Sequence, residues 1–132
     1  MAQKSPKPTA SELDILRVLW DRGPATVREV HDVLAESRDM GYTTVLKLLQ
    51  IMTVKGMVKR DEGARAHVYE ARQPAGNTKR QLVGDLLQRA FSGSASDLML
   101  HALSGKKTSR QEIEEIRRML DEYEAADQRR IK

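Results

Sequence analysis

The chain has 132 residues, of which 39% are hydrophobic and 32% are charged, and its net charge is +4 at neutral pH. This composition excludes a disordered chain and is typical of a soluble protein with one medium or two small domains. The absence of cysteine excludes disulfides, thiolate metal sites and a cysteine nucleophile. No apolar run opens the chain or approaches the length of a membrane span, so we expect a cytoplasmic protein without a signal peptide.

Two capping boxes mark the first two predicted helices. Thr9 and Glu12 open a helix that ends at the pair Gly23 and Pro24, and Thr26 opens a second helix in the same way. In a capping box, the hydroxyl of the first residue and the carboxylate of the fourth accept hydrogen bonds from otherwise unpaired amides. Aliphatic residues then recur at helical spacing, so we expect each helix to bury one face.

A third helix is predicted from about residue 43 to residue 55, and Gly56 is placed for the left-handed conformation that ends many helices. Segments 57–60 and 66–71 are rich in β-branched and aromatic residues, and a polar turn with a glycine separates them. This pattern predicts a β-hairpin. Three short helices followed by a hairpin form a winged helix-turn-helix, in which the hairpin is the wing.

The chain after residues 73–77 is predicted to be helical, with helices from about residue 78, from Ser94 or Ser96, and from Ser109. The predicted fold class is therefore mainly α, with a winged-helix domain over 1–75 and a helical dimerisation domain over 76–132. Three helices of this size bury little surface alone. Their apolar faces can pack back on the first domain or meet a second copy, and we expect the second copy. The predicted dimerisation residues are Leu82, Leu86, Phe91, Leu98, Leu100, Leu103, Ile113, Ile116 and Leu120.

The third helix and the strand after it carry the most informative charge pattern. From Gly41 to Arg60 there are four Lys or Arg and no acidic residue. A helix that exposes Thr, Lys and Gln without carboxylates is suited to contact phosphates and base edges. Lys47 and Gln50 are the best candidates for base contacts, and Arg28 is a weaker candidate for a phosphate. The other predicted DNA-contacting residues are Tyr42, Thr43, Thr44, Leu46, Lys55, Lys59, Arg60 and Arg65.

Alternatives remain open for several of these residues. The polar face can be an ordinary solvated face, and Tyr42 can stabilise the turn instead of binding a phosphate. Lys59 and its basic neighbours suit phosphates better than bases, and a solvated strand edge explains them equally well. The apolar Leu46 and Ile51 either contact thymine methyl groups or pack against neighbouring helices.

In this order and spacing, the motifs resemble the BlaI/MecI/CopY family of bacterial winged-helix repressors, typified by the penicillinase repressors. The resemblance implies a homodimer that covers a palindromic operator. In the best-known members, a membrane-anchored sensor metalloprotease relieves repression by triggering cleavage of the repressor. The motifs that carry the resemblance cover nearly the whole chain, at 11–20, 25–30, 42–45, 55–60, 68–69, 98–100 and 112–117.

The chain departs from this family pattern at two places. The penicillinase repressors are cut at an Asn–Phe bond, and the matching position holds His101 and Ala102. The copper-responsive members carry a cysteine cluster near the carboxyl end, which this chain lacks. We therefore expect neither a metal nor another cofactor.

Other function classes are less well supported. A winged helix can act as a protein–protein interaction module without binding DNA, and the apolar Leu46 and Ile51 favour that alternative. An RNA-binding winged helix would need surface aromatics that stack on unpaired bases. An enzyme is not expected, because the acidic clusters near the carboxyl end alternate with arginines and no nucleophile accompanies them.

Overall fold

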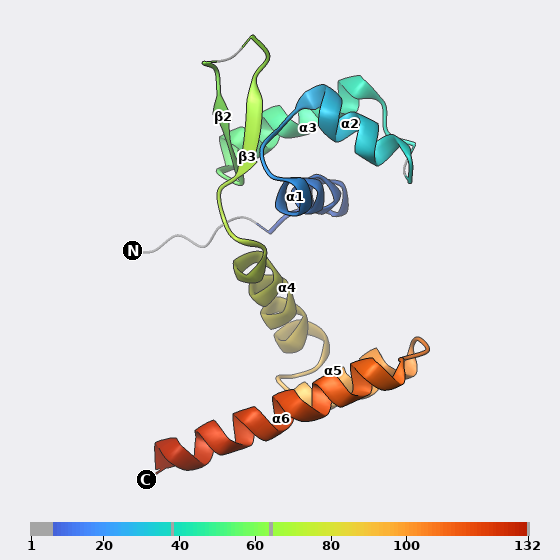
Figure 1. Ribbon diagram of the computed structural model, residues 1–132, viewed down its shortest axis with the longest axis vertical. Coiled ribbons are helices and arrows are strands. Elements are labelled where there is room, and N and C mark those ends of the chain that lie inside the picture. The colour runs from blue at the N-terminus through green and yellow to red at the C-terminus, as the bar shows by residue number, and fades with distance from the viewer. Residues whose placement is uncertain (1–6, 38, 64, 132) are drawn as a thin grey trace. The chain divides into compact units, whose positions relative to one another are not determined.

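The computed structural model describes residues 7–37, 39–63 and 65–131 (Figure 1). The segment 1–6, in which no signal peptide is expected, lies outside the described residues. So do Arg38 in the loop before the third helix and Ala64 in the predicted wing turn. The chain divides into two compact units, Met1–Asp85 and Leu86–Lys132, and each is described by itself.

Both predicted capping boxes are present at the first two helices, α1 (Ala10–Arg22) and α2 (Val27–Ala35). The Thr9 hydroxyl accepts from the Glu12 amide at 3.2 Å, and the Glu12 carboxylate accepts from the Thr9 amide at 2.9 Å. Thr26 and Glu29 repeat both bonds at the same distances. Gly23, at φ 92°, ends α1 as expected.

The third helix, α3, spans Tyr42–Lys55, close to the predicted bounds. Gly56 follows it in the left-handed conformation, with φ 82° and ψ 15°, which confirms its predicted role. The Met57 amide then donates to the carbonyl of Met52 at 2.9 Å, so the chain leaves the helix sharply and enters the wing.

The wing is part of a three-stranded antiparallel sheet rather than an isolated hairpin. Strands β2 (Val58–Asp61) and β3 (Val68–Ala71) form the predicted hairpin. A two-residue strand, β1 (Ala25–Thr26), pairs with the other edge of β3 and gives the order β1-β3-β2. The sequence predicted only a helix cap at Thr26. The additional pairing joins Val68 and Tyr69, at the turn side of β3, to the residues just before α2.

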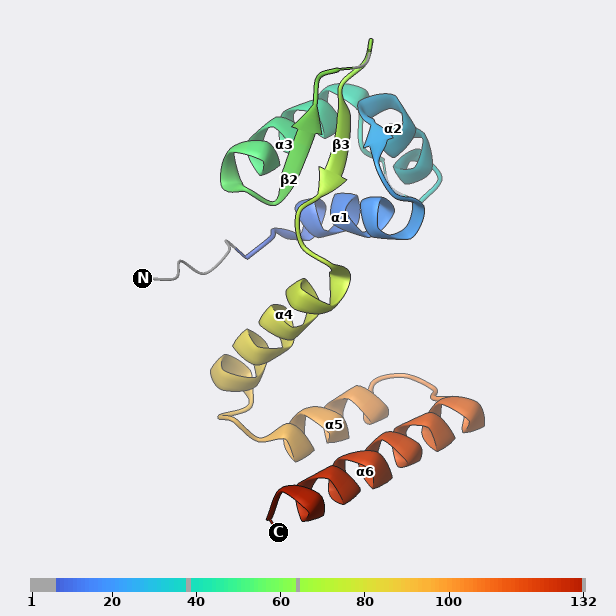
Figure 2. The same cartoon turned by 60° about the vertical axis from the view of Figure 1, so that its left-hand side comes forward.

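Helices α1, α2 and α3 gather beside this sheet around one aliphatic core (Figure 2). Tyr69 of β3 is the largest fully buried side chain, and Ile15, Val30 and Leu49 of the three helices belong to the same core. Trp20 is only partly buried and packs against this core. Its indole N–H donates to the Gln73 carbonyl at 2.9 Å, which satisfies the polar group of the ring.

Three helices follow the wing: α4 (Ala75–Ala90), α5 (Ala95–Ser104) and α6 (Arg110–Ile131). The Ser94 hydroxyl accepts from the Asp97 amide at 3.1 Å, so Ser94 rather than Ser96 caps α5. The Ser109 hydroxyl accepts from the Glu112 amide at 3.1 Å and caps α6. The two units divide within α4, after Asp85, whereas the sequence placed the domain boundary at residues 75 and 76.

The described side chains of the second unit, residues 86–130, form no fully buried apolar core. Helices α5 and α6 run antiparallel, yet no apolar side chain between residues 86 and 130 is buried. No helix formed by the described residues is long and apolar enough to cross a membrane.

Candidate nucleic-acid interface

One face of α3 is exposed and carries the residues predicted to read bases. Thr43, Lys47 and Gln50 are exposed, whereas Val45 and Leu49 are fully buried. Positions three, four and seven apart share a helix face, so the exposed residues form one stripe along α3. Within the described residues, no carboxylate lies on α3 or within its first turn.

Leu46 does not belong to that stripe. It is partly buried and packs against the core of the first unit. Of the two uses predicted for Leu46, the structure favours packing against neighbouring elements, and a contact of Leu46 with DNA stays a prediction. Ile51 differs, because 38% of its surface stays exposed.

The start of α3 brings together three side chains from two helices. The Arg28 guanidinium lies 5.5 Å from the centroid of the Tyr42 ring, within the range of a cation–π contact. The His31 ring meets Tyr42 edge-on, with centroids 6.0 Å apart. Gly41 caps α3 without a side-chain hydrogen bond. The structure thus places Arg28, a weaker sequence candidate, beside Tyr42, a residue predicted to contact DNA.

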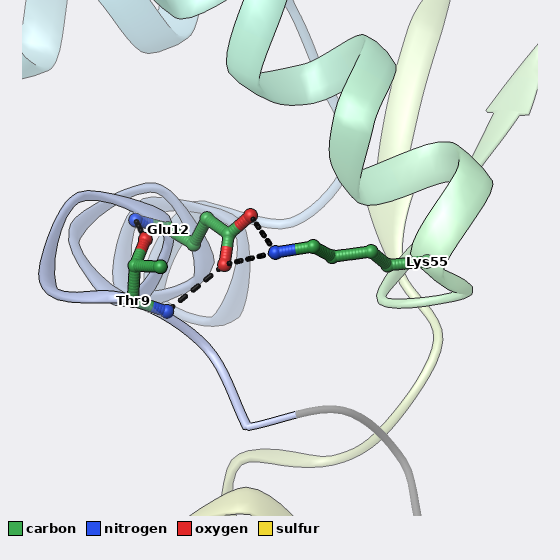
Figure 3. A network of polar contacts seen from close by, with 3 residues as sticks. All are labelled: Thr9, Glu12 and Lys55. Carbon is green, nitrogen blue, oxygen red and sulfur yellow. Dashed lines mark hydrogen bonds and ion pairs between the residues drawn. The ribbon is translucent and has the colours of Figure 1, made fainter.

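Lys55 has a structural partner within the first unit, and its predicted phosphate contact stays a prediction. Its ammonium lies 2.9 Å and 3.2 Å from the two carboxylate oxygens of Glu12, as Figure 3 shows. Glu12 is 1% exposed and also accepts from the Thr9 amide. Burial raises the pKa of Glu12, but the Thr9 amide and the Lys55 ammonium together lower it below its ordinary value of 4.5. Glu12 is therefore a buried carboxylate that needs the Lys55 cation.

Two basic residues of the wing, Lys59 and Arg60, are exposed but paired. Lys59 lies 2.9 Å from Glu70 across the two strands, and Arg60 pairs with Glu62. Exposed pairs of this kind contribute only about 0–1 kcal/mol, so a phosphate can compete for these cations. Arg65 is exposed at the wing turn.

The residues predicted to mediate dimerisation are arranged along the last three helices. Leu100 and Leu120 are 61% and 63% exposed, and Leu86 is 49% exposed. The other six residues of that set are exposed or partly buried.

His101 and Ala102, the residues predicted as a possible cleavage site, are exposed on α5. His101 Nδ1 lies 2.9 Å from the Asp97 carbonyl oxygen, and its ring is tilted by 56° against the Phe91 ring, with centroids 5.6 Å apart. Within the described ranges, no three His, Cys, Asp or Glu side chains are placed to hold a metal ion.

The sequence profile described as "Penicillinase repressor" matches residues 8–122, which is most of the chain and includes α1 to α5 and the wing. The chain belongs to the penicillinase repressor family. The family consists of transcriptional repressors rather than enzymes, and the winged helix described above is the part expected to carry that activity.

Curated relatives agree with this membership. The transcriptional regulator BlaI of Mycobacterium tuberculosis is 34% identical over 116 residues, which cover 86% of this chain and 83% of the relative. The penicillinase repressor of Staphylococcus aureus is 20% identical over 122 residues, which cover 92% and 97% of the two chains.

Solved structures of this family share the fold of the first unit. The DNA-binding domain of the repressor BlaI aligns with a TM-score of 0.50 at 21% identity, covering 58% of this chain and 93% of that domain. The monomeric form of Bacillus licheniformis BlaI, solved with the blaP half-operator, gives the same TM-score at 22% identity, with coverages of 56% and 90%. The winged-helix class predicted from the sequence is thereby confirmed.

Proposed function

We propose that this penicillinase repressor family member represses transcription as a homodimer that places the exposed face of α3 in the major groove of a palindromic operator. The acid-free stripe of Thr43, Lys47 and Gln50 on a winged helix is the observation that carries the proposal. Lysine and glutamine side chains bind guanine and adenine edges, and threonine suits phosphates or bases. The relative solved with a half-operator supports the same use of the fold.

Around this stripe, the proposal assigns the other exposed residues to the DNA backbone. Tyr42 and Arg28 lie together at the start of α3, where a phosphate can meet both the guanidinium and the phenol. Lys59, Arg60 and Arg65 extend positive charge along the wing. Because phosphate contacts release counterions, the affinity should fall steeply as salt rises.

The proposed dimer rests on the second unit. A unit with no buried apolar side chain between residues 86 and 130 gains stability by covering Leu100, Leu103 and Leu120 with a second copy. Twofold symmetry then presents two copies of α3 to two half-sites. Sedimentation velocity at micromolar concentration tests this step. A monomer at that concentration would contradict the dimer.

A mobility-shift assay tests the proposed function, with the full chain, its own upstream region and excess non-specific competitor. We expect a specific complex at low salt that weakens as salt increases. No specific complex at low salt would overturn the proposal. In that case, the alternative function is a protein-interaction module, for which the exposed apolar side chains of Ile51 and Val54 would provide contacts.

Relief of repression by a membrane-anchored sensor metalloprotease is part of the same proposal, as is a cytoplasmic location. His101 and Ala102 are exposed, but they lie inside helix α5, so cleavage there requires local unfolding of that helix. Mass spectrometry of the chain, recovered from cells that co-express such a protease, would show a cut at this bond. Recovery of only the intact chain under inducing conditions would exclude cleavage at this bond.

A further inference from the structure

We propose that Val54, with Ile51, reads the methyl groups of thymines in the operator. The inference rests on the proposed DNA-binding function and identifies a part of the sequence that the protein selects. Val54 is 89% exposed, the largest exposed fraction among the large apolar side chains of the described residues. It lies in the last turn of α3, in the interior of the chain, so its exposure is not that of a residue at a chain terminus.

The position of Val54 on the helix is what links it to DNA. Val54 follows Gln50 by four residues and Lys47 by seven, so it lies on the same stripe, one turn beyond Gln50. Ile51 precedes Val54 by three residues and borders the same stripe, with 38% of its surface exposed. A helix that lays Lys47 and Gln50 against base edges therefore carries both apolar side chains into the same groove.

The major groove offers one apolar group for such side chains. Among the base edges, only thymine presents a methyl group there, and the rest are hydrogen-bond donors and acceptors. A valine that contacts this methyl removes apolar surface of both groups from water, whereas the same valine opposite cytosine gains nothing comparable. The contact therefore discriminates by sequence.

The surroundings of Val54 favour DNA over a protein partner. An apolar site for a protein usually forms a contiguous patch, whereas Val54 and Ile51 lie among Thr43, Lys47 and Gln50. The helix carries cationic side chains and no carboxylate, which matches a polyanion.

Replacement of thymine by deoxyuridine isolates the methyl group. Binding sites are first selected from a random duplex library with the full-length protein, and each thymine is then replaced singly by deoxyuridine. The affinities of the wild type, Val54→Ser and the control Val33→Ser are compared on these duplexes. Serine removes both methyl groups of valine, and because Val54 is exposed the fold should survive. Val33, 38% exposed on α2, gives a matched substitution away from α3.

We expect deoxyuridine at one or two positions per half-site to weaken wild-type binding severalfold. Val54→Ser should lose that dependence, because serine has no methyl group to contact thymine, and Val33→Ser should keep it. Selection without any enriched sequence would contradict the DNA-binding function itself. Enriched sites that bind equally well with thymine and deoxyuridine would overturn only the present inference. So would an unchanged thymine dependence in Val54→Ser. If Val54→Ser binds no DNA, the dependence of the wild type and of an Ile51→Ser variant on thymine decides between these outcomes.

Discussion

Glu12 and Lys55 form an ion pair between the first turn of α1 and the last turn of α3, with the Lys55 ammonium 2.9 Å from one carboxylate oxygen. The same carboxylate completes the cap of α1 by accepting from the Thr9 amide. One buried side chain therefore fixes the start of α1 and the end of the proposed recognition helix. The direction in which α3 presents Lys47 and Gln50 depends on this link.

Lys55→Met should destabilise the first unit more than Lys59→Met does. Removing Lys55 leaves Glu12 buried without its cation, and loss of one partner of a buried pair costs about 3–5 kcal/mol. Because the Lys55 side chain is 34% exposed, we expect a smaller loss of about 2 kcal/mol. Lys59 pairs with Glu70 at the surface, so its loss should cost about 0.5 kcal/mol or less. Urea unfolding of both variants measures the difference, and equal losses would contradict the assigned role.

The dependence of stability on pH should report on Glu12. Its pKa in the folded protein lies below 4.5, so the stability that it contributes is present above pH 4.5 and is lost as the pH falls through the folded pKa. Glu12→Gln keeps an acceptor for the cap but removes this titration. The wild type should therefore be more stable than Glu12→Gln at neutral pH. The difference in stability between the two proteins should become smaller as the pH falls.

Glu114→Gln, at an exposed position on α6, serves as the control for that titration. Glu29, whose pKa the Thr26 amide lowers, is present in every variant, so its effect cancels in the comparison. Thermal unfolding between pH 3 and 7 suffices for the measurement. A gap between wild type and Glu12→Gln that stays constant across this range would show that Glu12 does not titrate as described.

The Glu12–Lys55 pair marks a limit of prediction from sequence. Glu12 is recognisable as part of a capping box because its partner Thr9 is three residues away. Lys55 is 43 residues from Glu12, and a lysine at a helix end beside a basic strand is equally typical of a phosphate contact. Strand β1 was missed for a related reason, since two residues carry no strand periodicity and pair only through tertiary contacts. Local signals predicted the helices, caps and hairpin because each depends on neighbours within one or two turns.

Substitution by alanine should change the stability of the protein in opposite directions at two glycines. Gly56 has φ 82°, and a Cβ there meets no atom within 4 Å, so the cost of Gly56→Ala is conformational. We expect a loss of about 1–2 kcal/mol, the cost of the left-handed conformation for a residue with a Cβ. Gly84 lies inside helix α4, and a Cβ there also meets nothing within 4 Å. Gly84→Ala should therefore stabilise the protein by about 0.5–1 kcal/mol. Calorimetry of both variants checks these signs.

Substitutions on α3 and on the wing should separate base reading from phosphate binding. Gln50→Ala and Lys47→Ala should change which sequences are selected, because each removes donors or acceptors aimed at base edges. Lys59→Ala should weaken all sequences alike and lower the salt dependence, because it removes a phosphate contact. Selection from random duplexes with each variant provides the comparison. If all three variants weaken binding without altering the selected sequence, the assignment of base contacts is wrong.

The exposed face of α3 shows which part of the site a sequence can predict. The alternation of Val45, Leu49 and Met52 with polar residues placed Thr43, Lys47 and Gln50 on the exposed side, and the structure agrees. Leu46 and Val54 are both apolar, and composition alone does not show that one packs on the core and the other is solvent-exposed. A count of turns from Gln50 would have indicated Val54, since four residues return to the same face.

The central claim is that α3 gives this protein a preference for one DNA sequence, and the ratio of two affinities measures it most directly. Fluorescence anisotropy compares the full chain on its selected operator with a scrambled duplex of the same composition, at one fixed salt concentration. We expect an affinity ratio on the order of 10³ or more for the wild type, and a much smaller ratio for Gln50→Ala. Equal affinities of the wild type for the two duplexes would contradict the central claim.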